Sequence, residues 1–137
     1  MKREDKYPNT DTFRLCNANP KNRITGDCTF RSIATATGKR WEDVVMEMAE
    51  MSVKTGCAIN DKKGQEKYLE SLGWVKHPQP RKPDGRKYTG VEWCREFRPH
   101  KVVAHIGGHH IVAIMDGKVV DHWNSTGGCI GNYWTEH

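Results

Sequence analysis

Apolar residues recur at helical spacing in the first half of the chain and predict three helices there. The clearest case is residues 40–51, where one face collects apolar side chains at intervals of three and four residues: Trp41, Val44, Val45, Met48 and Met51. Residues 28–37 and 61–72 show the same period, and each stretch is followed by a glycine, which is typical of a helix end. A fourth, short helix is expected over residues 89–97, where a threonine can cap the start.

The last third of the chain changes to short apolar runs that are typical of strands. Four strands are predicted: Lys101–His105, Ile111–Met115, Lys118–His122 and Ile130–Trp134. Asp116-Gly117 separates the second strand from the third and is a dipeptide favoured in two-residue hairpin turns. A further short strand is expected to begin near Trp74-Val75. The predicted class is α+β, with N-terminal helices packed on a C-terminal antiparallel β-sheet.

Length and composition fit one domain. The 137 residues are enough for a single hydrophobic core, which we place in one domain over residues 23–137. Residues 1–22 are polar and are expected to form an extended N-terminal segment anchored by Phe13 and Leu15. Residues 76–88 are rich in proline, lysine and arginine and predict an exposed basic loop. The net charge of +5 permits weak contact with nucleic acid or an acidic partner without requiring it.

The five cysteines do not suggest a disulfide framework. Their number is odd and no CxxC pair occurs. Residues 1–22 contain no apolar run of the kind that opens a secreted chain, and no stretch approaches the length of a transmembrane helix. We therefore expect reduced thiols in a cytoplasmic protein that has no membrane segment. The chemistry considered next requires no cofactor.

Cys28 is the candidate nucleophile. It follows Gly26-Asp27 at the predicted start of a helix, where the positive end of the helix dipole favours the thiolate form of a cysteine. His110 enters an apolar strand later in the chain. A cysteine at a helix start followed by a histidine on a strand is the order expected of a nucleophile and its general base.

The predicted hairpin gives this histidine a partner. If Asp116-Gly117 forms a two-residue turn, the strand register makes His110 and Asp121 diagonal neighbours on one face of the sheet. A hydrogen bond between the carboxylate and the imidazole is then within reach. The adjacent His109 faces the other way, and Asn124 is the alternative residue for orienting the imidazole.

In order and context, Cys28, His110 and Asp121 resemble the catalytic residues of the papain-like (clan CA) cysteine peptidases. The segment Gly26-Asp27-Cys28-x-Phe30-Arg31-Ser32-Ile33 also resembles the nucleophile motif of the ovarian-tumour (OTU) deubiquitinases. In length and layout the chain is more similar to small, largely uncharacterised papain-like proteins of bacteria and their phages. These proteins carry a His-x-Val-Ala-Ile…Asp-Gly-Lys-Val…Asp-x-Trp segment like residues 110–123 here.

The resemblance spans residues 22–125, but its specific motifs are confined to residues 26–45 and 107–125. The chain is much shorter than papain and lacks the aromatic and glycine residues that surround papain's cysteine. Papain's two-lobed cleft and its substrate class therefore do not carry over.

The resemblance implies a papain-like fold and a cysteine-dependent hydrolase, whether peptidase, isopeptidase or amidase. Such an enzyme acts through a thiolate–imidazolium pair and an acyl-enzyme. Asn22, six residues before Cys28, matches the place where papain-like enzymes often carry an oxyanion-hole amide, with Asn17 and Asn19 as alternatives. The backbone N–H of Cys28 would supply the other donor. The implied substrate is a protein or peptide, for example a host or ubiquitin-like protein.

Three other functions fit parts of the same sequence. A catalytically inactive papain-like module could bind a host protein or nucleic acid through the basic loop at 76–88. A cysteine-dependent acyl transferase would use the same nucleophile with a different acceptor. A metal protein could draw on the histidines of the last third of the chain, although no recognised zinc spacing occurs there; its candidate ligands are His105, His109, His110, His122 and Cys129.

Overall fold

A six-stranded mixed sheet forms the centre of the computed structural model, which describes residues 1–137. The helices are α1 (Arg3–Lys6), α2 (Cys28–Thr37), α3 (Trp41–Thr55), α4 (Lys62–Ser71) and α5 (Gly90–Phe97). The strands are β1 (Phe13–Leu15), β2 (Val75–His77), β3 (Lys101–Ile106), β4 (His110–Met115), β5 (Lys118–Asp121) and β6 (Ile130–Thr135). The α+β class is confirmed. None of the helices combines the length and the apolar character needed to cross a bilayer.

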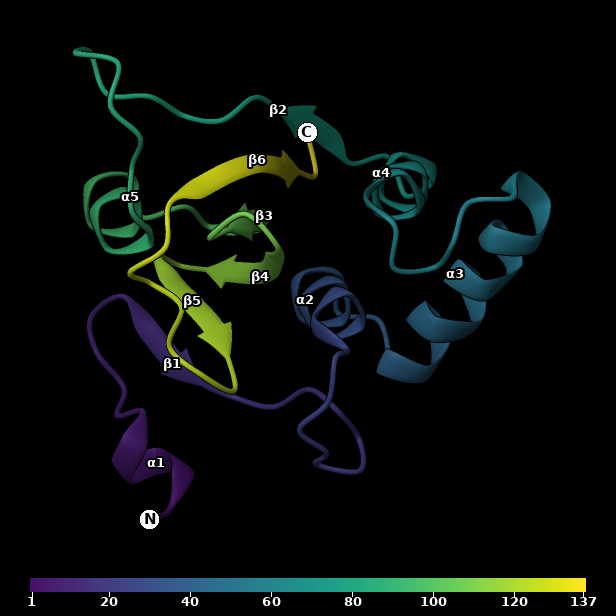
Figure 1. The fold of residues 1–137 in the computed structure, drawn as a ribbon, viewed down its shortest axis with the longest axis horizontal. Coiled ribbons are helices and arrows are strands. Elements are labelled where there is room, and N and C mark those ends of the chain that lie inside the picture. The colour runs from purple at the N-terminus through teal and green to yellow at the C-terminus, as the bar shows by residue number, and fades with distance from the viewer.

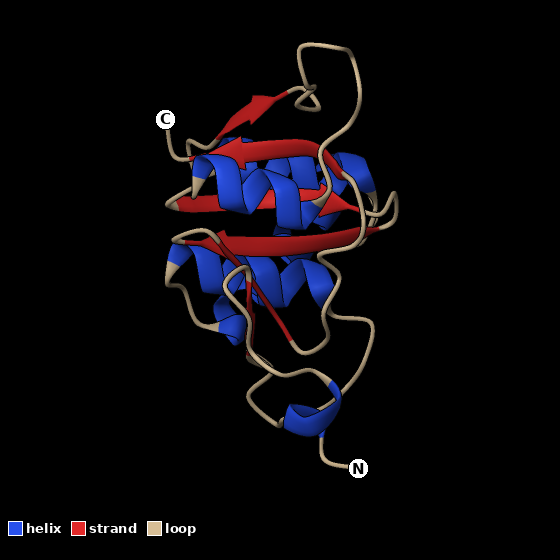
Figure 2. Cartoon of the chain, turned by 90° about the vertical axis from the view of Figure 1, so that its left-hand side faces the viewer, coloured by secondary structure: helices blue, strands red, loops and turns tan.

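The sheet separates two unequal helical layers. Helices α2, α3 and α4 lie on one side of it and α5 lies on the other (Figure 1). Seen from a direction at right angles, the long central strands run between the two sets of helices (Figure 2). The strand order is β1-β5-β4-β3-β6-β2. Strands β3, β4, β5 and β6 are therefore neighbours in the middle of the sheet, and the short strands β1 and β2 form its edges.

Two expectations for the sheet are corrected. The sheet is mixed rather than wholly antiparallel, because β1 pairs with β5 in parallel, with Phe13 opposite Val119. The segment over residues 1–22 is consequently not only an extended polar lead-in, since it contributes this strand and the single turn of α1. Three residues are too few to show an alternating pattern, so the strand is specified by pairing with β5 rather than by its own sequence.

The hairpin between β4 and β5 has the predicted geometry. Met115 pairs with Lys118, which makes Asp116-Gly117 a two-residue turn. Both turn residues have positive φ, 51° for Asp116 and 76° for Gly117, as the turn type favoured in hairpins requires. This turn fixes which residues of β4 and β5 lie on the same face of the sheet.

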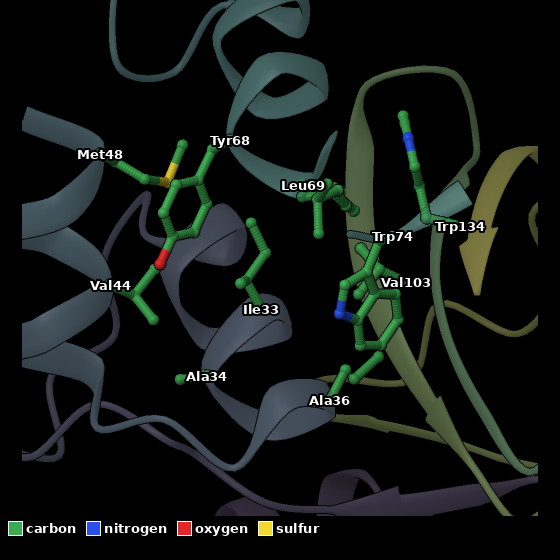
Figure 3. Packing of buried hydrophobic residues seen from close by; sticks show 12 residues of the cluster. Ile33, Ala34, Ala36, Val44, Met48, Tyr68, Leu69, Trp74, Val103 and Trp134 are labelled. Carbon is green, nitrogen blue, oxygen red and sulfur yellow. The ribbon is translucent and has the colours of Figure 1, made fainter. Parts of the chain in front are cut away.

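Each face of the sheet buries its own apolar cluster. On the side of α2, α3 and α4, side chains from the three helices converge between them (Figure 3), among them Ile33, Val44, Met48 and Tyr68. On the opposite side, α5 covers a second cluster that includes Phe13, Trp93, Val112, Ile114 and Val119. Helix α2 is held against β4 by the first cluster. This packing places the start of α2 beside the start of β4.

Candidate active site

Cys28 is the first residue of α2 and is partly buried against the core. The residue before it, Asp27, occupies the N-cap position, but its side chain makes no hydrogen bond to the helix backbone. The first N–H of this turn to bond within the backbone is that of Arg31, which donates to the Asp27 carbonyl at 3.0 Å. The N–H groups at the extreme start of α2, including that of Cys28, thus make no hydrogen bond within the protein and are called open below.

His110 and Asp121 form the predicted pair. Strand β4 begins at His110 and β5 ends at Asp121, and Nε2 of His110 donates to Oδ2 of Asp121 at 2.5 Å. The Asp121 side chain is 2% exposed, whereas that of His110 is 16% exposed. A buried carboxylate therefore holds the imidazole from behind while part of the ring stays accessible. The bond fixes the second ring nitrogen, Nδ1, as the one available to Cys28.

The charges of the pair support each other. Burial alone would raise the pKa of Cys28, but a hydrogen bond and charge attraction from His110, a hydrogen bond from the Ile111 backbone and the charge of Arg31 outweigh it, so the pKa lies below its ordinary value. Burial opposes the protonated form of His110, yet its bonds to Asp121 and Cys28 raise the pKa of the imidazole to about 9. The two shifts reinforce each other, because the imidazolium favours the thiolate and the thiolate favours the imidazolium.

Arg31 joins the two carboxylates behind the site. It lies one turn into α2, is 5% exposed, and its Nε donates to Oδ1 of Asp27 at 2.7 Å. Its Nη1 donates to Oδ1 of Asp121, the oxygen that does not face His110. The hydrogen bond from His110 and the charge of Arg31 outweigh burial and lower the pKa of Asp121, while Arg31 and the backbone N–H of His122 hold Oδ1 in place. Arg31 is a positioning residue for the Asp121–His110 pair.

Asp27 ties this network to the rest of the helical layer. Its Oδ2 accepts from Asn19 Nδ2 and from the indole Nε1 of Trp41, both at 3.0 Å. These bonds and the one from Arg31 occupy both oxygens of the Asp27 carboxylate, which therefore does not accept from the N–H groups at the start of α2. The open N–H groups at the start of the helix follow from that arrangement.

The structure places the proposed oxyanion-hole residue on the surface. Asn22 is exposed with a φ of 53°, and its amide oxygen accepts from Asn17 Nδ2 at 3.3 Å. No hydrogen bond joins it to Cys28 or His110. The alternatives are engaged as well, since Asn17 also donates to the Arg23 carbonyl and Asn19 donates to Asp27. The role of Asn22 stays a prediction, and the open N–H groups of α2 are the better placed donors.

Asn124 lies beside the site but in a different role from that of an orienting residue. Its Oδ1 accepts from the backbone N–H of Thr126 at 3.0 Å and from the Thr126 hydroxyl at 2.6 Å, which fixes a turn. Asp121 therefore holds the position next to the imidazole. The ring of Trp123 lies against that of His110, with 5.0 Å between the ring centres.

A hollow of about 380 Å³ opens next to His110. It is lined by the tip of the β3–β4 hairpin and by the loop after β5, and most of its wall is glycine, serine and asparagine, with Trp123 at one side. Small side chains let a substrate backbone approach closely. The hollow can therefore seat a chain segment next to the imidazole.

The remaining cysteines and histidines form no second centre. Cys94 is buried, and its burial raises the pKa of its thiol to about 12, so it is unreactive at neutral pH. No group of three or more His, Cys, Asp or Glu side chains comes together in a way that could hold a metal ion. Of the five metal-ligand candidates from the sequence, His109 and His110 line the hollow described above, and His105 and Cys129 line another.

Sequence reasoning missed the connection through Arg31. The ion pair of Arg31 with Asp27, four residues earlier, is of the kind that helical spacing allows. The second partner, Asp121, lies 90 residues away, and no local pattern predicts such a contact.

Comparison with protein-family models, with curated proteins and with solved structures finds no match for this chain.

The coupled charges predict a distinctive pH dependence of stability. The raised pKa of His110 stabilises the fold fully below the unfolded value of 6.5, and this contribution is lost as pH rises toward about 9. The lowered pKa of Cys28 contributes in the opposite sense, because its stabilisation is present above the unfolded value and is lost as pH falls. The two contributions therefore have opposite slopes and offset each other between pH 6.5 and 9, so the free energy of unfolding should change less with pH than it would if His110 alone were shifted.

Replacing the thiol should expose the histidine contribution. In Cys28→Ser the free energy of unfolding is expected to fall as pH rises from 6.5, by up to roughly 1.4 kcal/mol per pH unit. Urea denaturation of both proteins at four pH values between 6.5 and 8.5 measures this. Parallel pH profiles for wild type and Cys28→Ser would show that the two groups are not coupled.

Proposed function

We propose that this chain is a papain-like cysteine hydrolase, cytoplasmic in setting, that cleaves a peptide, isopeptide or amide bond through Cys28. The observation that carries the proposal is the placement of His110, which contacts the buried carboxylate of Asp121 through Nε2 and lowers the pKa of Cys28 from its other side. A thiol, an imidazole and a carboxylate in that order are the components of thiol-based acyl transfer. The five free cysteines fit a compartment in which thiols stay reduced.

The proposed reaction begins with the thiolate of Cys28. The sulfur attacks the substrate carbonyl carbon, forming an S–C bond and a tetrahedral oxyanion. The open N–H groups at the start of α2 stabilise that charge, helped by the helix dipole. His110 then gives its Nδ1 proton to the leaving nitrogen as the C–N bond breaks, and an amine departs.

The second half of the reaction regenerates the enzyme. His110, now neutral, takes a proton from a water molecule that attacks the thioester. The C–S bond breaks, the acid product leaves, and the imidazolium faces the thiolate again. Asp121 stays ionised throughout and holds the ring in one tautomer, with Arg31 holding Asp121. No cofactor takes part in these steps.

A peptide or protein substrate fits the surroundings of the pair. The hollow beside His110 is open to solvent and lined by glycines, so an extended backbone can lie along it. The chain builds no deep enclosed cavity at this point that would suit a small molecule alone. We therefore place a host protein, a ubiquitin-like protein or another polypeptide as the substrate class.

A library of peptidyl aminomethylcoumarins, varied at the residue before the scissile bond, tests the proposal. We expect coumarin release from a subset of peptides and, after acid quenching, an acyl adduct on Cys28 detected by mass spectrometry. Release should be lost in Cys28→Ala and kept in Cys57→Ala, which removes another partly exposed thiol. Release that survives in Cys28→Ala, or the absence of any release from a folded protein across the library, would contradict a hydrolase of this kind.

A further inference from the structure

A second hollow, of about 540 Å³, also adjoins the tip of the β3–β4 hairpin. Gly107 lines both hollows. The side chains that give the second hollow its character come from α4, β3, β6 and the loops before α5 and β6: Lys62, Gln79, Lys87, His105, Cys129 and Asn132. We name it the basic pocket. A substrate that occupies the first hollow and passes the hairpin tip would enter it.

The two lysines of the basic pocket carry unneutralised charge. No carboxylate lines the pocket, and the Lys62 ammonium contacts only the carbonyl of Gly108, at 3.4 Å. Three other cations of this part of the chain are each held by an acidic residue: Lys76 by Glu66, Lys82 by Glu92 and Arg86 by Asp84. The charges of Lys62 and Lys87 are therefore available to an incoming anion.

The inner wall of the pocket adds to this preference. His105 Nδ1 is buried and has no hydrogen-bond partner. Burial, followed by the charges of Lys62 and Lys76, lowers the pKa of His105 to about 4, so the ring is neutral and stands in a positive field. Gln79 donates its amide to the Ile130 carbonyl at 2.8 Å and is thereby fixed in the wall. A negative group in the pocket would relieve the field that acts on His105.

We propose that the basic pocket is a substrate subsite that binds the carboxylate of an acidic side chain near the scissile bond. The proposal rests on the hydrolase function above and narrows its substrate class to acidic peptide segments. Lysines act as point charges and do not impose the bidentate geometry of arginine. The pocket therefore recognises negative charge at this position with little restriction on the shape of the group that carries it.

Cys129 lines the pocket and reports on its charge without any substrate. Iodoacetate and iodoacetamide differ in charge but little in size, so the ratio of their alkylation rates at Cys129 measures the local electrostatic potential. We expect this ratio to be roughly threefold higher at Cys129 than at the exposed Cys16 at low ionic strength. The excess should vanish in Lys62→Gln/Lys87→Gln. Lys63→Gln, which changes an exposed lysine outside the basic pocket, should retain it.

A pair of short peptides tests binding itself. Acetyl-Ala-Glu-Ala-amide should slow iodoacetamide labelling of Cys129, and also of Cys28, more than acetyl-Ala-Gln-Ala-amide does, and the difference should be lost in Lys62→Gln/Lys87→Gln. Equal protection by both peptides would overturn the proposal. So would an iodoacetate-to-iodoacetamide ratio at Cys129 that equals the ratio at Cys16, or one that is unchanged in Lys62→Gln/Lys87→Gln. If Cys129 behaves as expected while Cys28 is inert, the basic pocket binds carboxylates and it is the hydrolase function that fails.

Discussion

Replacing Arg31 by methionine is expected to lower the free energy of unfolding by about 3–5 kcal/mol, because it leaves two buried carboxylates without their shared cation. Asp27 and Asp121 are 4% and 2% exposed, so water cannot take the place of the guanidinium. Methionine keeps much of the length and apolar character of the arginine stem, which limits the loss of packing to a small share. Urea denaturation at pH 7 measures the change.

Arg95→Met is the matched control for this substitution. Arg95 also forms a two-contact ion pair with an aspartate, Asp11, at 2.7 and 3.1 Å. The side chains of Arg95 and Asp11 are both largely exposed, so little change in the free energy of unfolding is expected. If Arg31→Met and Arg95→Met lower the free energy of unfolding by similar amounts, Arg31 is not the buried link between the helix start and Asp121 that the structure describes.

The second large effect concerns the reactivity of Cys28 after His110→Ala. Without the imidazole, burial raises the pKa of the thiol with only the Ile111 backbone and Arg31 opposing it. The iodoacetamide rate at Cys28 should then follow the thiolate fraction and climb roughly a hundredfold between pH 6 and pH 8, a factor of ten per pH unit. In the wild type the same rate should change much less over that range, because His110 lowers the pKa of the Cys28 thiol.

His100→Ala controls for the general loss of a histidine–aspartate contact. His100 Nδ1 pairs with Asp116 Oδ1 at 2.5 Å, the same separation as in the His110–Asp121 bond, but the pair is largely exposed. Its removal should leave the pH profile of Cys28 unchanged. A flat profile in His110→Ala, in a protein whose circular dichroism matches the wild type, would show that another group activates the thiol.

The helices and the hairpin could be predicted because local patterns specify them. Helix α2 has the predicted bounds, Cys28–Thr37, and Gly38 ends it with a φ of 77°. Helix α3 continues to Thr55, four residues beyond the prediction, because no glycine or proline interrupts the chain before Gly56. The Asp116-Gly117 turn gave the strand register, and from that register followed the contact between His110 and Asp121.

The parts that escaped prediction depend on contacts between distant segments. Strand β1 exists because it pairs with β5, more than 100 residues away. The link from Arg31 to Asp121 requires α2 and β5 to be placed in space first. The oxyanion-hole role of Asn22 rests on its spacing from Cys28 and stays a prediction, and in the structure the Asn22 side chain accepts a hydrogen bond from Asn17 on the surface. Spacing along the chain does not fix the direction of a loop side chain.

The central claim is that His110 activates the thiol of Cys28 by lowering its pKa, and labelling the native wild-type protein with limiting iodoacetamide tests it most directly. The reaction is run at intervals from pH 5 to 9, and the labelled cysteine is located by mass spectrometry. The account predicts that label concentrates on Cys28 among the five cysteines and that this preference persists below pH 7. Label spread evenly over the exposed cysteines, or an inert Cys28 at pH 6, would contradict it.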